Sequence, residues 1–144
     1  MGERICRVLT PADIPAMEDI LLDSGGRFVP DRIAHFLNSA GNLMFGAFEN
    51  DRLVGLLYGY TLCRMDDRAS QFFAYSLDVH TAFRGRGIGS ELFLYVTEYC
   101  RQKGYGEVFV PTEKDNIPAC RIYEKAGGRS ETGNDIIYVI GFED

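Results

Sequence analysis

The sequence lacks most of the residues from which metal centres and disulfide frameworks are built. Its 144 residues contain two histidines and four cysteines, with no C-x-x-C pair and no zinc-like spacing. No apolar run approaches the roughly 20 residues that a membrane-spanning helix needs, and no apolar secretory segment opens the chain. These absences predict a cytoplasmic protein with reduced thiols, no metal and no membrane partner.

Basic residues are also few, since 15 Lys and Arg stand against 21 Asp and Glu and give a net charge of −6. A nucleic-acid-binding protein needs a basic face, so we expect no nucleic-acid partner. The negative balance is compatible with a cationic small molecule, although many proteins carry such charge for solubility alone. At this length, residues 1–144 are expected to form a single domain with one core.

What the sequence does contain is a glycine-rich turn between a predicted strand and a predicted helix. Residues 72–79 are rich in aromatic and β-branched side chains, and apolar residues recur at helical spacing from Ile88 onward. The first N–H groups of a helix lack partners and carry partial positive charge, and glycines let a ligand approach them. The turn therefore predicts a phosphate site, with Arg84 and Arg86 suited to phosphate oxygens.

Two familiar phosphate-binding motifs do not fit this turn. A P-loop requires Lys and then Ser or Thr after its last glycine, whereas Ser90 and Glu91 follow Gly89. A dinucleotide-binding fingerprint has the spacing G-x-G-x-x-G, whereas Gly85, Gly87 and Gly89 are each two residues apart. Both motifs are therefore excluded.

The remaining pattern predicts an α+β protein. Strands are expected over residues 4–9, 43–48, 53–62, 72–79, 107–111 and 135–142. Helices are expected over 11–22, from Pro30 to near Gly41, over 88–103, and from a cap at Asp115 or Asn116 to Gly127. The three long strands from 43 to 79 have short links and should be antiparallel, whereas strand 107–111 follows a crossover and should be parallel.

The turn, read as R-x-x-G-x-G between a strand and a helix, resembles the acetyl-CoA loop of the GNAT N-acetyltransferases. A second stretch resembles that family's N-x-x-A-x-x-x-Y-x-K-x-G signature, with Asn116, Ala119, Tyr123, Lys125 and Gly127. The two signatures stand in the family's order, about thirty residues apart, and the predicted order of elements is also that of the family. Weaker similarity to the aminoglycoside 3-N-acetyltransferases runs from Tyr75 to Leu92.

The resemblance implies a single-domain GNAT fold, in which a mixed, mostly antiparallel sheet with splayed central strands is flanked by helices. It also implies acetyl-CoA as cosubstrate, with no metal. In this family the main chain of two strand residues, here Leu77 and Val79, holds the pantetheine arm, and the loop holds the pyrophosphate. The cofactor-binding residues expected on this basis are Leu77, Val79, Arg84, Gly85, Arg86, Gly87, Ile88, Gly89, Ser90, Asn116, Ala119 and Tyr123.

The second signature implies that Tyr123 is the general acid for the CoA thiolate, although periodicity alone would make it a core residue. Many relatives carry a carboxylate at the position of Ser76, where serine cannot act as a base unaided. Asp78 lies two residues on, on the same strand face, and is the preferred base, with a solvated strand-end carboxylate as the alternative. Glu113 and Asp135 are weaker candidates.

Other polar residues are given structural roles. His80 is expected at the surface, and Cys120 is expected to pack in the core because no partner base for a thiolate nucleophile is identifiable. The acidic residues of the first two helices are interpreted as solvated charges; they are Glu18, Asp19, Asp23 and Asp31.

We therefore expect an enzyme that transfers acetyl from acetyl-CoA to a primary amine of a small cationic molecule, aminoglycoside-like or polyamine-like, by direct attack in a ternary complex. Two alternatives stay open: acetylation of a protein or peptide amine, and a non-catalytic CoA-binding module, which the lack of a carboxylate at Ser76 would favour. The apolar stretch 136–142 would suit pairing across a homodimer.

Overall fold

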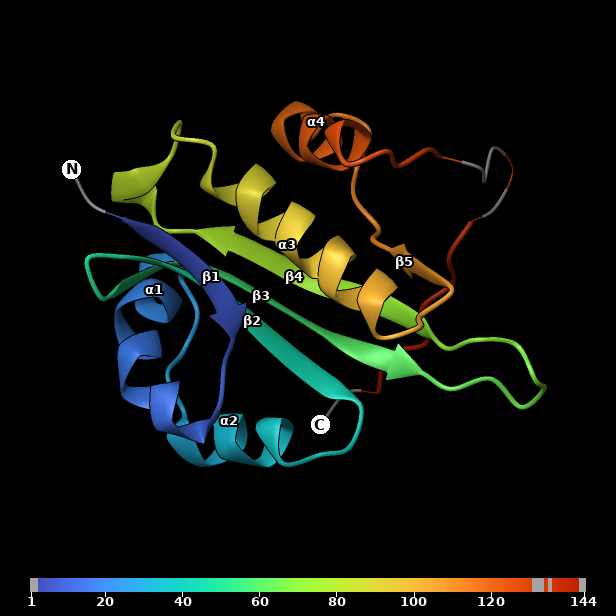
Figure 1. Ribbon diagram of the computed structural model, residues 1–144, viewed down its shortest axis with the longest axis horizontal. Coiled ribbons are helices and arrows are strands. Elements are labelled where there is room, and N and C mark those ends of the chain that lie inside the picture. The colour runs from blue at the N-terminus through green and yellow to red at the C-terminus, as the bar shows by residue number, and fades with distance from the viewer. Residues whose placement is uncertain (1–2, 131–133, 135, 143–144) are drawn as a thin grey trace.

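A single five-stranded sheet in the order β1-β2-β3-β4-β5 organises the chain (Figure 1). The computed structural model describes residues 3–130, 134 and 136–142. The strands are β1 (Arg4–Val8), β2 (Asn42–Glu49), β3 (Arg52–Leu62), β4 (Gln71–Val79) and β5 (Glu107–Phe109). The helices are α1 (Met17–Asp23), α2 (Pro30–Leu37), α3 (Ile88–Gln102) and α4 (Ile117–Lys125). Strands β1 to β4 are antiparallel neighbours and β5 runs parallel to β4, which confirms the predicted pairing of the long strands and of β5.

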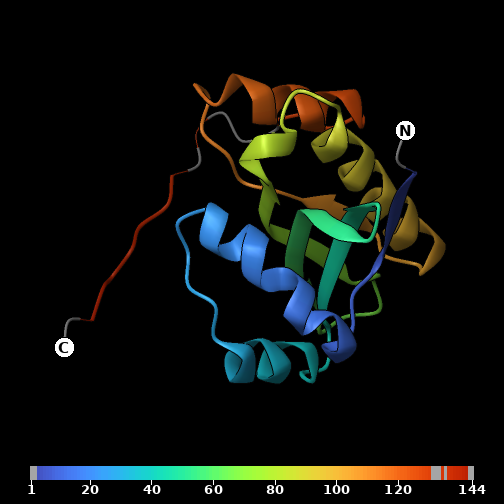
Figure 2. The same cartoon turned by 90° about the vertical axis from the view of Figure 1, so that its left-hand side faces the viewer.

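Helices cover both faces of the sheet, and each face has its own apolar core (Figure 2). On one face α3 packs over the middle strands, where Phe45, Leu57 and Phe72 meet Leu92 and Val96. On the other face α1 and α2 cover β2 and β3, with Met17, Ile20, Met44, Leu53 and Leu56 buried between them. The helical spacing of apolar residues is what gives α1 and α3 a buried face.

A two-residue turn joins β2 to β3. Asn50 and Asp51 both have positive φ, at 50° and 67°, and Glu49 pairs with Arg52 across the turn. Positive φ at both central residues matches the right-handed twist of a hairpin, and Asn and Asp tolerate it better than other side chains. The predicted hairpin is confirmed.

A β-bulge interrupts β4 in its middle. Ser76 pairs with Tyr58 and Ala74 pairs with Gly59, so Tyr75 is one extra residue on β4. The backbones approach closely here, because a Cβ built on Gly59 would lie 2.1 Å from the carbonyl oxygen of Phe73. A bulge bends its strand and increases the local twist, so the second half of β4 runs in a different direction from the first.

The first predicted helix, over residues 11–22, is wrong as a continuous element. Residues Pro11–Ala16 form a 3-10 helix and the α-helix begins only at Met17. Pro15 explains the break, because it has no N–H and its ring would clash with the carbonyl four residues earlier in an α-helix. Two ends also differ from expectation, since α2 stops at Leu37 and β5 stops at Phe109.

The predicted C-terminal strand is wrong where the structure describes it. Residues 136–142 form no strand, and their six large apolar side chains are 72–88% exposed. Figure 2 shows this segment as an extended trace apart from the helices and the sheet. Alternating apolar residues predict which side chains share a face, but a strand also needs a partner for its N–H and C=O groups. Asp135, the predicted first residue, lies outside the described residues.

Candidate active site

The strands β4 and β5 separate soon after they meet. Their pairing covers only Gln71–Phe73 of β4, opposite Glu107–Phe109 of β5. Figure 1 shows β5 beside the first part of β4 alone, while the chain beyond β5 turns away towards α4. Within the described residues, the outer edge of β4 from Leu77 to Val79 therefore faces no strand.

The main-chain groups of Leu77 and Val79 point towards this opening. The N–H of His80 donates to the carbonyl of Val54 on β3 at 2.9 Å, so His80 faces β3. Successive residues of a strand direct their N–H and C=O groups to alternate edges, which places those of Val79 and Leu77 on the opposite edge. The side chain of Arg84 confirms this direction, because its Nε donates to the Val79 carbonyl at 3.3 Å.

Helix α3 begins at the same end of β4. Gly85 and Gly87 have positive φ, at 80° and 77°, and a Cβ built on either would meet no atom within 4 Å. The first main-chain hydrogen bond of α3 joins Glu91 N–H to Gly87 O, so the N–H groups of residues 88–90 precede the helical ladder. Free N–H groups at a helix N-terminus beside open space form an anion-binding arrangement.

Polar contacts from α1 hold the chain just before this loop. The carboxylate of Asp23 accepts from Thr81 N–H at 2.9 Å and from Thr81 Oγ1 at 2.6 Å. His80 is only 7% exposed, so the expectation that it lies at the surface is wrong. Its Nδ1 accepts from Ala82 N–H at 3.2 Å, and its Nε2 lies 3.4 Å from the Asp19 carboxylate. Asp23 is therefore a structural partner of the chain before the loop, and Asp19 contacts His80 from an exposed position, so the expectation of purely solvated charges is wrong for these two residues. Glu18 and Asp31 are exposed, as expected.

The two arginines of the loop differ in their surroundings. Arg84 reaches back to the Val79 carbonyl and so lies beside the opening. Arg86 lies 3.4 Å from the Glu49 carboxylate and its guanidinium is 5.0 Å from the centre of the Phe83 ring. Arg84 is thus the cation closer to the opening.

Helix α4 lies across the start of α3. Its cap is Asn116, whose Oδ1 accepts from Ala119 N–H at 3.2 Å, so Asn116 and not Asp115 begins the helix. Close contact between the helices explains Gly89, because a Cβ there would lie 2.9 Å from Ile122 Cδ1. Tyr123 packs against Phe93 of α3, with ring centres 4.8 Å apart.

The Tyr123 hydroxyl makes no hydrogen bond within the described part of the chain. Burial of the side chain is the main reason why the pKa of Tyr123 is raised above its ordinary value, with a smaller contribution from Cys120. The phenol is therefore protonated at neutral pH and has a proton to give.

Asp78 lies on the opposite face of the sheet from Tyr123. Its register partner is Leu56, which belongs to the core under α1 and α2. Ser76 shares this face, because its Oγ donates to Asp78 Oδ2 at 3.4 Å. The shared face predicted for these two residues is confirmed. The opening between β4 and β5 is the place where the sheet is interrupted and a group could be reached from both of its faces.

The remaining candidates contribute less. Asp135 lies outside the described residues, and Glu113 offers its main-chain carbonyl to the Cys120 thiol at 3.6 Å. Burial raises the pKa of both Cys6 and Cys100 to about 11, so neither thiol forms a thiolate readily. Among residues 3–130, 134 and 136–142, no group of three or more His, Cys, Asp or Glu is arranged to hold a metal ion.

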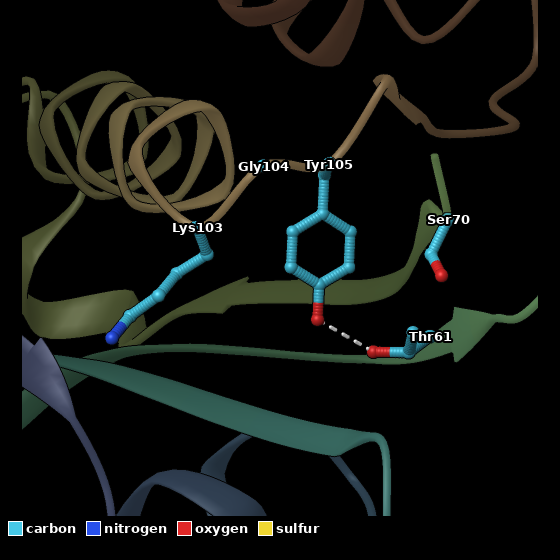
Figure 3. A pocket seen from close by; sticks show the side chains of 5 residues that line it. All are labelled: Thr61, Ser70, Lys103, Gly104 and Tyr105. Carbon is cyan, nitrogen blue, oxygen red and sulfur yellow. Dashed lines mark hydrogen bonds between the residues drawn. The ribbon is translucent and has the colours of Figure 1, made fainter. Parts of the chain in front are cut away.

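A separate pocket lies away from this region. An open depression of about 240 Å³ is lined by Thr61, Ser70, Lys103, Gly104 and Tyr105, and the hydroxyls of Thr61 and Tyr105 share a hydrogen bond of 2.7 Å (Figure 3). Lys103 and Gly104 follow the C-terminal end of α3, the end opposite the glycine-rich loop. This pocket is therefore not part of the candidate site.

Comparison with known proteins assigns the class. Residues 14–128 match the sequence profile of the Acetyltransferase (GNAT) family. This match covers both signatures and the strands β2 to β5. The chain therefore belongs to the GNAT acetyltransferase family. The family and the fold predicted from the two signatures are confirmed.

Individual relatives are more distant. The chain is 25% identical over 104 residues to human N-acetyltransferase 8B and 28% identical over 96 residues to N-alpha-acetyltransferase 30 of Schizosaccharomyces pombe. These alignments cover 72% and 65% of this chain but only 45% and 61% of the relatives. The same fold is found in an aminoglycoside acetyltransferase, meta-AAC0020 from an uncultured soil metagenomic sample, whose crystal structure contains sisomicin. The two structures superpose with a TM-score of 0.83 and 20% sequence identity, and the alignment covers 98% of this chain and 97% of the other. Within the described residues, no helix has the length and apolar character needed to cross a bilayer.

Proposed function

We propose that this chain, acting as one domain, transfers an acetyl group from acetyl-CoA to a primary amine of a small cationic molecule. Acetyl-CoA binds with its pyrophosphate on the N–H groups at the start of α3. Its pantetheine arm extends along the free edge of β4, and its thioester lies in the opening between β4 and β5. Transfer occurs by direct attack of the amine in a ternary complex.

The observation that carries this proposal is the position of the unpaired edge of β4. Main-chain groups of Leu77 and Val79 face the opening, and the open N-terminus of α3 lies at the same end of the strand. An extended arm with amide groups can pair with such an edge as an additional strand does. The arm and its phosphates are then held by one continuous surface.

The reaction forms a C–N bond and breaks a C–S bond. The amine nitrogen attacks the thioester carbon, and the carbonyl oxygen becomes an oxyanion that a main-chain N–H of β4 stabilises. Collapse of this intermediate breaks the C–S bond and expels CoA thiolate, which takes the proton of Tyr123 Oη. The proton that the attacking nitrogen still has to lose passes through water and restores the Tyr123 phenol. The products are the acetamide and CoA.

The base acts from the other face of the sheet. An alkylammonium must lose a proton before it attacks, and Asp78 takes that proton directly or through water. Because Asp78 and Tyr123 lie on opposite faces, the acetyl group must sit in the opening itself, where both faces are within reach.

Two relatives support different acceptors. The aminoglycoside acetyltransferase with the same fold supports a small polyfunctional amine. The yeast relative, by its name an N-alpha-acetyltransferase, supports the amine of a peptide. We favour the small molecule, and the peptide amine is the second candidate.

Binding of acetyl-CoA is the first test. Saturating acetyl-CoA should raise the melting temperature by about 5–10 °C, because a ligand that binds only the folded state stabilises it. Gly87→Val should abolish this shift. Gly104→Val is the matched control, since Gly104 also has positive φ, at 89°, and open space around it, but lies after the end of α3.

The two variants separate binding from backbone strain. Valine should lower the melting temperature without ligand at both positions, whereas only Gly104→Val should keep the shift with acetyl-CoA. No shift in the unmodified protein at millimolar acetyl-CoA would overturn the proposed function. A shift without CoA release in the presence of small amines and peptides would identify a non-catalytic CoA-binding module.

A further inference from the structure

His80 is a buried ionisable residue that the proposed reaction does not use. It follows β4 directly and is only 7% exposed. Its N–H donates to the Val54 carbonyl of β3 at 2.9 Å, and its own carbonyl accepts from Phe83 N–H at 2.8 Å. A short 3-10 helix, Thr81–Phe83, begins after it and leads into the glycine-rich loop, residues 84–89. His80 therefore joins the sheet to the start of the loop.

The main chain determines which nitrogen of the His80 ring carries a proton. Nδ1 accepts from Ala82 N–H at 3.2 Å and so caps the 3-10 helix. A neutral imidazole has one N–H and one acceptor nitrogen, so the proton belongs on Nε2. That nitrogen lies 3.4 Å from Asp19 Oδ1 and 3.8 Å from Asp23 Oδ1, two carboxylates of α1. The neutral ring thus links α1 to the 3-10 helix.

Arg52 also approaches the ring, with Nη2 3.3 Å from His80 Nε2. Arg52 keeps its bond to Asp19 Oδ2, at 2.7 Å, whichever ring nitrogen is protonated. Ala82 N–H, in contrast, can bond only to an unprotonated Nδ1, so the cap selects the tautomer. The charged groups around the ring are Asp19 and Asp23 from α1 and Arg52 from β3, with Arg84 of the loop close to Asp23.

His80 is the member of this cluster that can change charge near neutral pH. Histidine ordinarily titrates between about pH 5 and 8, whereas arginine stays charged. A hydrogen bond from Arg52 holds the pKa of Asp19 below its ordinary value, and hydrogen bonds from Thr81 lower the pKa of Asp23. A proton added at Nδ1 would face the main-chain N–H that this nitrogen now accepts from, and two donors cannot bond to each other. Protonation of the ring therefore removes the cap.

Phe83 carries the effect of the cap into the loop. Its ring meets the His80 ring edge to face, with centres 5.7 Å apart. Two guanidinium groups, those of Arg52 and Arg86, each lie 5.0 Å from the centre of the Phe83 ring. Arg84 follows directly, and its Nε donates to a carbonyl of β4 beside the opening. A 3-10 helix that loses its cap therefore changes the position of both loop arginines.

We propose that His80 is a positioning residue for the acetyl-CoA site and that protonation of its Nδ1 weakens acetyl-CoA binding. The inference rests on the proposed function, in which the glycine-rich loop holds the pyrophosphate, and it adds a dependence on pH to that site. Because binding prefers the neutral ring, the affinity for acetyl-CoA falls as the pH falls. By linkage, bound acetyl-CoA in turn favours the neutral ring.

Calorimetric titration with acetyl-CoA at about pH 7.5 and about pH 5.5 tests this dependence. No amine is added, so the ionisation of Asp78 and of the acceptor does not enter the measurement. The phosphate monoester of CoA also titrates near about pH 6, but this contribution is common to all variants because the ligand is the same. The quantity compared between variants is the ratio of Kd at low pH to Kd at high pH.

His80→Asn separates the cap from the titration. The side-chain oxygen of asparagine takes the place of Nδ1, accepts from Ala82 N–H and does not titrate. Its Kd at high pH should stay within about twofold of that of the unmodified protein, and its Kd ratio should be about 3- to 10-fold smaller, the range for one hydrogen bond. His80→Gln moves the amide beyond the cap position and should bind acetyl-CoA about 3- to 10-fold more weakly at high pH.

His35→Asn is the matched control. His35 is the other histidine of the sequence and is exposed on α2, so this variant should keep the Kd ratio of the unmodified protein. It also leaves His80 as the only histidine, so that ¹⁵N NMR of the untagged protein reads its ring directly. We expect the proton on Nε2 at about pH 7.5 and a smaller protonated fraction at about pH 5.5 when acetyl-CoA is bound.

The possible outcomes separate this inference from the proposed function. A Kd ratio in His80→Asn equal to that of the unmodified protein, or a neutral ring with its proton on Nδ1, would overturn the inference and leave the proposed function standing. Equal weakening in His80→Asn and His80→Gln at high pH would also overturn it, because the ring would then act by packing alone. If a His80 variant failed to fold, the NMR measurement on the His35→Asn protein would still decide. Absence of acetyl-CoA binding at both pH values would overturn the proposed function as well.

Discussion

Helix α3 begins beside the opening of β4 and α4 packs on its first turns, yet the two helices are held in different ways. Helix α3 has six buried residues and lies on the sheet, whereas α4 has none and packs on α3. The contacts of α4 run through a few side chains, chiefly Ile122 on Gly89 and Tyr123 on Phe93. The same 3.6-residue periodicity predicts both helices, but it does not reveal this difference in burial.

This difference in burial suggests that α3 and α4 serve two purposes, stability of the fold and chemistry. Truncating a fully buried side chain costs several kcal/mol, and α3 has six buried residues, so α3 mainly maintains the fold and offers only its first turn to a ligand. A half-buried helix tolerates change in stability, so a reactive side chain can be placed there at small cost to the fold. The following variants examine whether stability and chemistry are in fact divided between α3 and α4.

The largest effect is expected for Tyr123→Phe. It should lower kcat by about 10²- to 10⁴-fold, the range for loss of a general acid, with little change in acetyl-CoA affinity. The melting temperature should hardly change, because the lost hydroxyl has no hydrogen bond within the described residues. Tyr95→Phe on α3 is the control and should keep kcat. An unchanged kcat in Tyr123→Phe, with chemistry rate-limiting, would make Tyr123 a packing residue.

Truncation of apolar side chains should destabilise the protein more on α3 than on α4, whereas the larger loss of activity is expected on α4. Leu92→Ala on α3 should reduce the free energy of unfolding by about 2–5 kcal/mol, because a fully buried leucine leaves a cavity. Ile122→Ala on α4 should cost less than half as much, since Ile122 is half-buried. Urea denaturation followed by circular dichroism measures both. Equal losses would contradict the division between the two helices.

Asp78→Asn should lower kcat/KM for the amine by about 10²-fold, because the amide keeps the shape of the carboxylate and cannot take a proton. Ser76→Ala removes the neighbouring hydroxyl, 3.4 Å away, and should leave most of the activity. If both variants retained kcat/KM, proton removal would have to occur through another group, and Glu113 would be examined next.

Most of the fold could be predicted from the sequence, because the local preferences of turns, caps and periodic segments are consistent with the tertiary contacts that these segments make. The Asn50–Asp51 turn, the glycine-rich turn and the Asn116 cap each have a local cause that a sequence displays. The helix break at Pro15 was also readable, since an internal proline excludes the hydrogen bond and the space of an α-helix. The prediction of a strand over residues 136–142 was wrong because the alternation of apolar residues gives no information about a strand partner.

The residues of the candidate site are a prediction from the sequence, whereas their arrangement in space needed the structure. Two signatures pointed to the loop and to α4, but no local pattern places Asp78 and Tyr123 on opposite faces of the sheet. The bulge at Tyr75 and the ring contacts of Tyr75 with Tyr58 and Tyr60 depend on pairing between strands, which single residues do not specify. The contact of Asp23 with Thr81 joins residues 58 apart in the chain, and acidic residues on a short helix gave no sign of it.

That contact gives the smallest expected effect and extends the comparison to a third helix, α1. Asp23 accepts from both the N–H and the hydroxyl of Thr81, three residues before Arg84, so α1 fixes where the loop begins. Asp23→Asn removes the charge from both bonds and should raise KM for acetyl-CoA about 3- to 10-fold, in line with the 1.5–3 kcal/mol span for hydrogen bonds to charged groups when part of it is recovered by the amide. The amine KM and kcat should change by less than about twofold, because Asp23 acts through the loop and touches neither reacting group.

Glu18→Gln, which removes an exposed charge from the same helix, is the control and should leave KM for acetyl-CoA unchanged. Equal effects of the two variants would mean that net charge matters and the position of the loop does not; then α3 alone would hold the phosphate site.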